Sequence, residues 1–184
     1  MMFSQFMQNE PILEFQSRAL QETLSANEVR IYQKISDYLD EYVDYYNLDH
    51  SFVAAAHRKF IKQYSADLRT FVDTGLFPFE ASTRSSELSR IEYDLSLILS
   101  CMLVKHRFNI MSMIYQIQLD ARPTLIVGVG SGLELFLMSE ASNKAENKNS
   151  TNLIDAFDLT ISEFVSTKFK TTPHVSLYAT EFKK

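Results

Sequence analysis

The stretch Thr124-Leu-Ile-Val-Gly-Val-Gly-Ser-Gly132 joins an apolar, β-branched run to three closely spaced glycines. The chain has only four glycines, at positions 75, 128, 130 and 132, so it concentrates three of them here. Glycine lets a backbone adopt positive φ or approach a ligand closely. The pattern predicts a buried strand over Leu125–Val129, a tight turn, and a helix over Leu133–Glu140.

A strand, a glycine turn and a helix in this order direct backbone N–H groups and the positive end of a helix dipole at one point. Such a point suits a nucleotide or another anionic group. The spacing is G-x-G-x-G, whereas the dinucleotide fingerprint G-x-G-x-x-G would need its third small residue at Leu133. The Gly-Lys-Ser/Thr of a P-loop does not follow, which excludes a nucleotide-triphosphate site of that kind.

This motif resembles the first motif of the class I S-adenosylmethionine-dependent methyltransferases, a strand followed by G-x-G-x-G. Ile154-Asp-Ala-Phe-Asp-Leu-Thr160 is similar to the second strand of that family, which ends in an acid followed two positions later by Ser or Thr. The resemblance implies that Asp158 accepts the ribose hydroxyls of the cofactor and that Gly128, Gly130 and Gly132 let the backbone approach it. The alternative is that Asp158 caps the next helix, beside Thr160 and Ser162.

Val175-Ser-Leu-Tyr-Ala-Thr-Glu181 looks like the third strand of the family. The resemblance implies that Glu181 lies near the adenine amino group. One position departs from the pattern, because many members carry an acid two residues before the first glycine and Ile126 stands there. The contacts to the methionine end of the cofactor therefore have no assigned residue.

Composition and charge limit the classes of function. The chain has 184 residues, 46% hydrophobic and 22% charged, as in an ordinary globular protein. Its net charge of −5, without a basic block, disfavours nucleic acid and anionic membranes as partners. The single Cys101 excludes an intramolecular disulfide and suits the cytoplasm, and the N-terminus lacks the features of a signal peptide. No histidine has metal-ligand spacing, so we expect no metal.

Residues 1–122 read as mostly helical. Amphipathic spacing predicts a helix over about Pro11–Leu24 with Ile12, Phe15, Ala19 and Leu20 on its buried face, and Asn27 as the cap of the next helix. A further helix is expected over Ser51–Asp73, with an apolar stripe from Phe52 to Phe71 and a stop at Gly75. A long helix from about Ser85 continues or restarts near Lys105. The polar stretch Ala141–Asn152 is expected to be a surface loop.

The expected fold is α/β, with an α-helical N-terminal domain (1–122) followed by a partial Rossmann-like, class I methyltransferase-type parallel sheet (123–184). Only three strands are expected, so the chain looks like the front half of such a cofactor domain. It would be either a truncated sequence or a subunit completed by another chain. A homo-oligomer is the other partner considered, beside a small-molecule substrate.

The leading hypothesis is an S-adenosylmethionine-binding transferase, in particular a cytoplasmic methyltransferase of unassigned acceptor and catalytic base. A second hypothesis rests on Leu76-Phe-Pro-Phe79, Ile91-Glu-Tyr-Asp-Leu95 and Val129-Gly-Ser-Gly132, which resemble nicotianamine-synthase-like aminobutyrate transferases. That resemblance implies that Tyr93 and Glu80 face the active site. A third hypothesis is a non-catalytic Rossmann-like module that acts through protein contacts, and a nicotinamide or flavin oxidoreductase is disfavoured by the glycine spacing.

Overall fold

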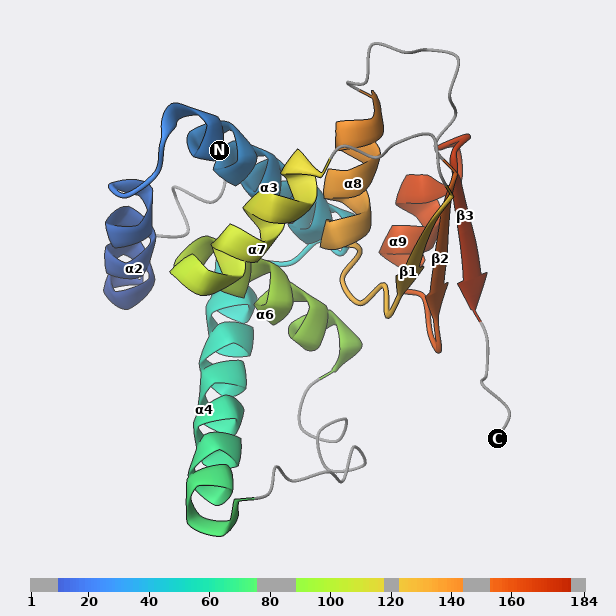
Figure 1. The fold of residues 1–184 in the computed structure, drawn as a ribbon. Helices are drawn as coiled ribbons and strands as arrows, with labels where there is room; N and C mark the ends of the chain where they lie inside the picture. The colour runs from blue at the N-terminus through green and yellow to red at the C-terminus, as the bar shows by residue number, and fades with distance from the viewer. Residues whose placement is uncertain (1–9, 76–88, 118–122, 144–152, 180–184) are drawn as a thin grey trace.

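The computed structural model describes residues 10–75, 89–117, 123–143 and 153–179, and it has a mixed α/β fold (Figure 1). The helical part comprises α2 (Pro11–Gln21), α3 (Ala26–Tyr45), α4 (His50–Thr74), α6 (Arg90–Leu103) and α7 (Lys105–Gln116). The remaining elements are β1 (Thr124–Val127), α8 (Leu133–Asn143), β2 (Ile154–Asp158), α9 (Glu163–Phe169) and β3 (Val175–Ala179). The predicted order of a helical part followed by strands alternating with helices is confirmed.

Capping residues set where two of the long helices begin. The Ser25 side chain accepts from the Glu28 N–H, and the Glu28 carboxylate accepts from the Ser25 N–H, which together form a capping box for α3. The prediction of Asn27 as this cap is wrong, because the box places Asn27 inside the first turn. Ser89 and Glu92 form the same reciprocal pair at the start of α6.

Helix α2 buries only Leu20 of the expected face, and Ala19 is exposed. Ile12 and Phe15 are each 73% exposed. The buried positions of α2 are Leu13, Ser17 and Leu20. The buried Ser17 hydroxyl bonds to the Tyr32 hydroxyl of α3 at 2.7 Å, so the inward face of α2 combines two leucines with a polar contact. The predicted buried face is therefore wrong at Ile12 and Phe15.

Helix α4 is buried over its N-terminal half only. Its buried residues are Val53, Ala54, Ala56 and His57, whereas Tyr64, Leu68 and Phe71 of the expected stripe are exposed. Figure 1 shows the C-terminal half of α4 extending away from the other helices. Gly75 ends the helix as predicted, with φ at 71° in the left-handed region.

Helices α6 and α7 are separated at Val104, where the chain bends by 92°. The long helix anticipated in this region therefore restarts rather than continues. Among the described helices, none by itself is long and apolar enough to cross a membrane. Helices α6 and α7 taken together pass the same test of length and composition, as a bent pair.

The three strands form a parallel sheet in the order β1-β2-β3. Ile126 of β1 is in register with Ala156 of β2, which is in register with Leu177 of β3. Helices α8 and α9 lie on the side of the sheet that faces the helical part (Figure 1). Side chains of β1 on the opposite face are exposed, with Leu125 at 64% and Val127 at 65%, so the prediction of a buried strand is wrong for this face.

One buried apolar cluster runs through the structure. It joins residues of α2, α3, α4, α6 and α7 to residues of α8, β2 and α9. Helix α8 packs against both α7 and α3. The cluster thus crosses the expected boundary at residue 122, and the division into domains 1–122 and 123–184 stays a prediction. Helix α8 also includes residues 141–143 of the expected polar loop, while 144–152 lie outside the described residues.

Candidate functional site: the glycine turn

The glycine turn, residues 128–132, connects β1 to α8 as predicted. The Gly128 N–H donates to the Phe157 carbonyl at 2.8 Å, which extends the β1–β2 pairing by one residue into the turn. Gly128, Gly130 and Gly132 all have positive φ, at 80°, 54° and 78°. Helix α8 begins at Leu133, so its N-terminus follows the turn directly. This is the local geometry that orients backbone N–H groups toward a bound group.

The three glycines have different steric surroundings. A Cβ at Gly132 would lie 2.6 Å from Val165 Cγ2 and 2.7 Å from the Tyr38 hydroxyl oxygen, so Gly132 is needed for close packing. A Cβ at Gly128 would have no atom within 4 Å. A Cβ at Gly130 would meet only Leu97 Cδ1, at 3.9 Å. The turn therefore has open space beside Gly128 and Gly130, and it is closed against the protein at Gly132.

Asp158, the last residue of β2, lies beside the turn. Its Oδ2 accepts from the Gly130 N–H at 2.9 Å, and its Oδ1 accepts from the Thr160 N–H at 3.3 Å. The structure thus brings together the carboxylate and the glycines that the sequence pattern placed in one site. The alternative role of Asp158 as the cap of α9 is wrong, because Ser162 is the N-cap and its Oγ accepts from the Val165 N–H at 3.3 Å.

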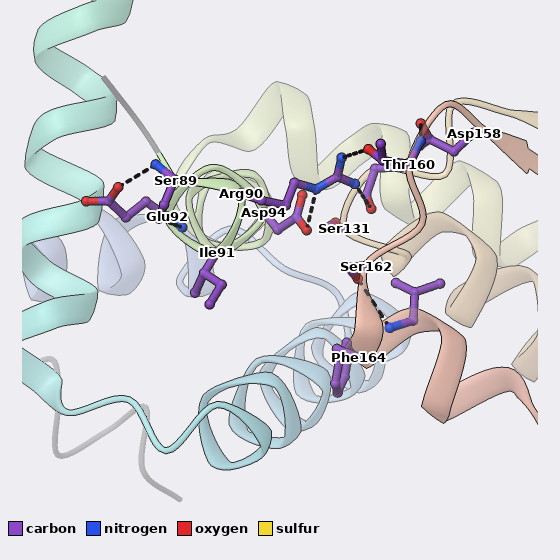
Figure 2. A network of polar contacts seen from close by, with 12 residues as sticks. Ser89, Arg90, Ile91, Glu92, Asp94, Ser131, Asp158, Thr160, Ser162 and Phe164 are labelled. Atoms are coloured by element: carbon purple, nitrogen blue, oxygen red, sulfur yellow. Dashed lines mark hydrogen bonds and ion pairs between the residues drawn. The ribbon is translucent and has the colours of Figure 1, made fainter. Parts of the chain in front are cut away.

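Arg90, in the first turn of α6, connects the helical part to the loops after β1 and β2 (Figure 2). Its Nη2 donates to the Gly130 carbonyl at 2.9 Å, and its Nη1 donates to Thr160 Oγ1 at 3.0 Å. Its Nε donates to Asp94 Oδ2 at 2.9 Å, one helical turn further along α6. Three acceptors on three segments therefore hold the plane of this guanidinium.

Tyr38 of α3 provides a second contact from the helical part to the turn. Its hydroxyl donates to the Ser131 carbonyl at 2.7 Å. The Tyr38 side chain is fully buried, and this burial raises its pKa well above the ordinary value, so the hydroxyl keeps its proton. Its ring packs against Phe136 of α8 and Phe164 of α9.

Asp94 is a buried carboxylate with one of its two oxygens unpaired. The side chain has 0% exposure, and Oδ1 has no hydrogen-bond partner among the described residues. Burial raises the pKa of Asp94, because a charged carboxylate loses its hydration there, while the ion pair with Arg90 acts in the opposite direction. The negative charge of Asp158 also raises the pKa of Asp94.

The remaining predicted site residues do not join this site within the described structure. Tyr93 of α6 pairs its ring with Phe60 of α4, with centroids 6.5 Å apart. Glu80 and Glu181 lie outside the described residues. Ile126, where an acid was expected, sits in the middle of β1 and packs against the apolar cluster.

Sequence reasoning missed Arg90, Asp94 and Tyr38. The spacing of Arg90 and Asp94 predicts an ion pair on one helix face. No local signal indicates that Arg90 also reaches Gly130 and Thr160, which lie 40 and 70 positions along the chain. Tyr38 reads as an ordinary core residue of an amphipathic helix.

The site places opposite charges on the two sides of Gly130. The Asp158 carboxylate lies on its N–H, and the Arg90 guanidinium lies on its carbonyl. A carboxylate accepts hydrogen bonds from hydroxyl groups, and a guanidinium donates to anionic oxygens. The described residues contain no group of three or more His, Cys, Asp or Glu side chains that could hold a metal ion. The site therefore suits a ligand that carries both hydroxyl groups and an anionic group.

Comparison of this chain with known protein-family models, curated proteins and solved structures finds no match in any of the three. The conclusions about function therefore rest on the geometry of the glycine turn and of the residues around it.

Proposed function

We propose that this protein binds S-adenosylmethionine and acts as a transferase, specifically a methyltransferase on a small-molecule acceptor. The observation that carries the proposal is the hydrogen bond from the Gly130 N–H to Asp158 Oδ2. It sets a carboxylate at the end of β2 against a turn of three glycines with positive φ. A carboxylate in that place can accept from both hydroxyls of a ribose.

The charge beside the turn favours this cofactor over a dinucleotide. In a dinucleotide fold, the diphosphate lies against the N–H groups of the turn. Here the Asp158 carboxylate already uses the Gly130 N–H, so this N–H is not available to a diphosphate, and the cation of Arg90 lies on the carbonyl side of Gly130 instead. S-adenosylmethionine carries a ribose diol and a cationic sulfonium, and neither of these is repelled by the carboxylate.

The strand order supports the same proposal. A doubly wound fold has the order 3-2-1 in its first half, with ligands at the carboxyl ends of the strands. The sheet here has its three strands in that sequential order, and both the glycine turn and Asp158 lie at the carboxyl ends of β1 and β2. When bound, the cofactor would supply an activated methyl group. The described residues would hold its ribose and exclude water on the side of Gly132.

The proposal places the protein in the cytoplasm. Cys101, its one cysteine, is buried, and burial raises the pKa of the thiol to about 11. A neutral, buried thiol is compatible with a reducing compartment. The aminobutyrate-transferase alternative gains no support from Tyr93, because the recorded ring contact of Tyr93 is with Phe60 of α4.

Isothermal titration calorimetry on the full chain tests the proposal. We expect S-adenosylmethionine and S-adenosylhomocysteine to bind more tightly than NAD. The Asp158→Ala variant should lose affinity for both adenosyl ligands. NAD binding more tightly than either ligand would refute the cofactor assignment, and so would the absence of binding by all three.

A further inference from the structure

The glycine turn is flanked by a cation as well as by an anion, and the ribose uses only the anion. Among the described residues, Arg90 is the one cationic side chain with a recorded hydrogen bond to residues 128–132. Its position is defined by Gly130, Thr160 and Asp94, so it is oriented before any ligand arrives.

Arg90 keeps the capacity to bind an anion. A guanidinium has five N–H donors, and the three recorded hydrogen bonds account for three of them. The Arg90 side chain is 39% exposed, while the Asp94 carboxylate that anchors it is completely buried. The remaining two N–H bonds belong to Nη1 and Nη2, one on each, and either can donate to an anionic oxygen.

We propose that Arg90 binds the α-carboxylate of the amino-acid portion of S-adenosylmethionine. This inference rests on the proposed function and adds a contact to the methionine end of the cofactor, for which the sequence pattern assigns no residue. Arg90 and Asp158 hold the carbonyl and the N–H of the same residue, Gly130. The cofactor carries a ribose diol and a carboxylate on opposite sides of its sulfonium, and the two side chains match these two groups.

Asp94 acts as a positioning residue in this arrangement. Its bond to Nε fixes the rotation of the guanidinium, so that the two outer nitrogens lie toward Gly130 and Thr160 (Figure 2). In this arrangement Arg90 binds the ligand and also bridges α6 to the loops after β1 and β2. A pure bridge would affect all ligands of the site equally, whereas a carboxylate contact affects only ligands that carry the carboxylate.

The test compares two ligands that differ by one group. S-adenosylhomocysteine carries the α-carboxylate, and S-adenosyl-3-thiopropylamine keeps the amine and lacks the carboxylate. Their dissociation constants are measured by calorimetry on the full chain for wild type, Arg90→Gln and Arg90→Lys. Lys59→Gln is the matched control, because Lys59 also pairs with a carboxylate of α6, Glu92, but has no recorded bond to the turn.

Arg90→Gln should weaken S-adenosylhomocysteine by a factor on the order of 10 to 100, as expected for loss of a charge-assisted bond. The same variant should weaken S-adenosyl-3-thiopropylamine much less, because that ligand loses only the bridging contacts of Arg90, and its binding also shows that the site is folded. Arg90→Lys keeps the positive charge but lacks the planar guanidinium. Its ratio of the two dissociation constants should therefore lie between those of wild type and Arg90→Gln. Lys59→Gln should behave as wild type with both ligands.

Equal weakening of both ligands in the Arg90 variants would overturn the inference and leave Arg90 as a bridge between segments. If the ratio of the two dissociation constants in Arg90→Lys equals the ratio in wild type, the inference is overturned as well, even where Arg90→Gln does not fold. Both results differ from failure of the proposed function, in which wild type would prefer NAD or bind neither adenosyl ligand.

Discussion

Substituting Gly132 by alanine tests whether the glycine turn is built for packing at this position. The added Cβ would lie 2.6 Å from Val165 Cγ2 and 2.7 Å from the Tyr38 hydroxyl oxygen, both of which belong to buried side chains. A non-glycine residue at φ near 78° costs about 1–2 kcal/mol by itself. Overpacking a buried site adds about 1–3 kcal/mol. We therefore expect Gly132→Ala to lower the free energy of unfolding by about 2–5 kcal/mol.

Two controls separate the backbone cost from the steric cost. Gly75 has a similar φ of 71°, but its Cβ position has nothing within 4 Å, so Gly75→Ala should show the backbone cost alone. Val165→Ala removes the methyl groups that the new Cβ would meet. The double variant Gly132→Ala/Val165→Ala should therefore be less destabilised than the sum of the single variants, by about 0.5–3 kcal/mol.

Urea denaturation followed by circular dichroism gives the free energy of unfolding of each variant. Because of the steric overlap at position 132, Gly132→Ala should lose more free energy of unfolding than Gly75→Ala. Its loss should also depend on whether Val165 is present. Equal losses for the two glycine variants, or strict additivity in the double variant, would refute it.

Two further predictions concern ionisable groups. Removing the carboxylate in Asp158→Ala should weaken S-adenosylhomocysteine binding by about 1.5–3 kcal/mol. It should also lower stability, since the carboxylate accepts from two backbone N–H groups. Ser162→Ala, at the cap of α9, is the control and should cost about 1 kcal/mol of stability with little change in affinity. Equal affinities in the two variants, measured by calorimetry, would contradict the ribose role. The second prediction concerns His57, whose pKa is lowered by burial, so that the unfolded chain takes up its proton first on acidification. Stability should be fully present above pH about 6.5 and fall below it, and His57→Leu should reduce this fall. Urea midpoints measured from about pH 7 to 5 test this, and parallel profiles of wild type and variant would rule it out.

Local signals in the sequence predicted much of the chain path. The β-branched run followed by glycines predicted β1, the turn and α8, because strand formation and positive φ are demands of a few adjacent residues. Gly75 marked the end of α4 for the same reason. The family resemblance of residues 154–160 placed Asp158 beside the glycines, and the parallel pairing of β1 with β2 brings the carboxyl ends of both strands to one edge of the sheet.

The spacing of apolar residues predicted the buried faces of α2 and α4 less well. Ile12 and Phe15 fit a helical apolar stripe, yet both are exposed, while the polar Ser17 is buried and bonded to Tyr32 of α3. Tyr64 continues the stripe of α4 but lies on the half that extends beyond the other helices. Burial depends on what lies opposite a helix, and that is not encoded in the spacing within it.

The sequence by itself determined most of the helices and strands and the glycine turn, since each depends on the backbone preferences and polarity of neighbouring residues. Only the tertiary structure decided that Arg90 and Tyr38 hold the turn from the helical part. These side chains reach carbonyls 40 and 93 positions away, at Gly130 and Ser131. A carbonyl oxygen is the same acceptor in every residue, so no residue type at position 130 or 131 could signal the contact. It exists because the packing of α3 and α6 brings the donors within hydrogen-bond distance of that stretch of backbone.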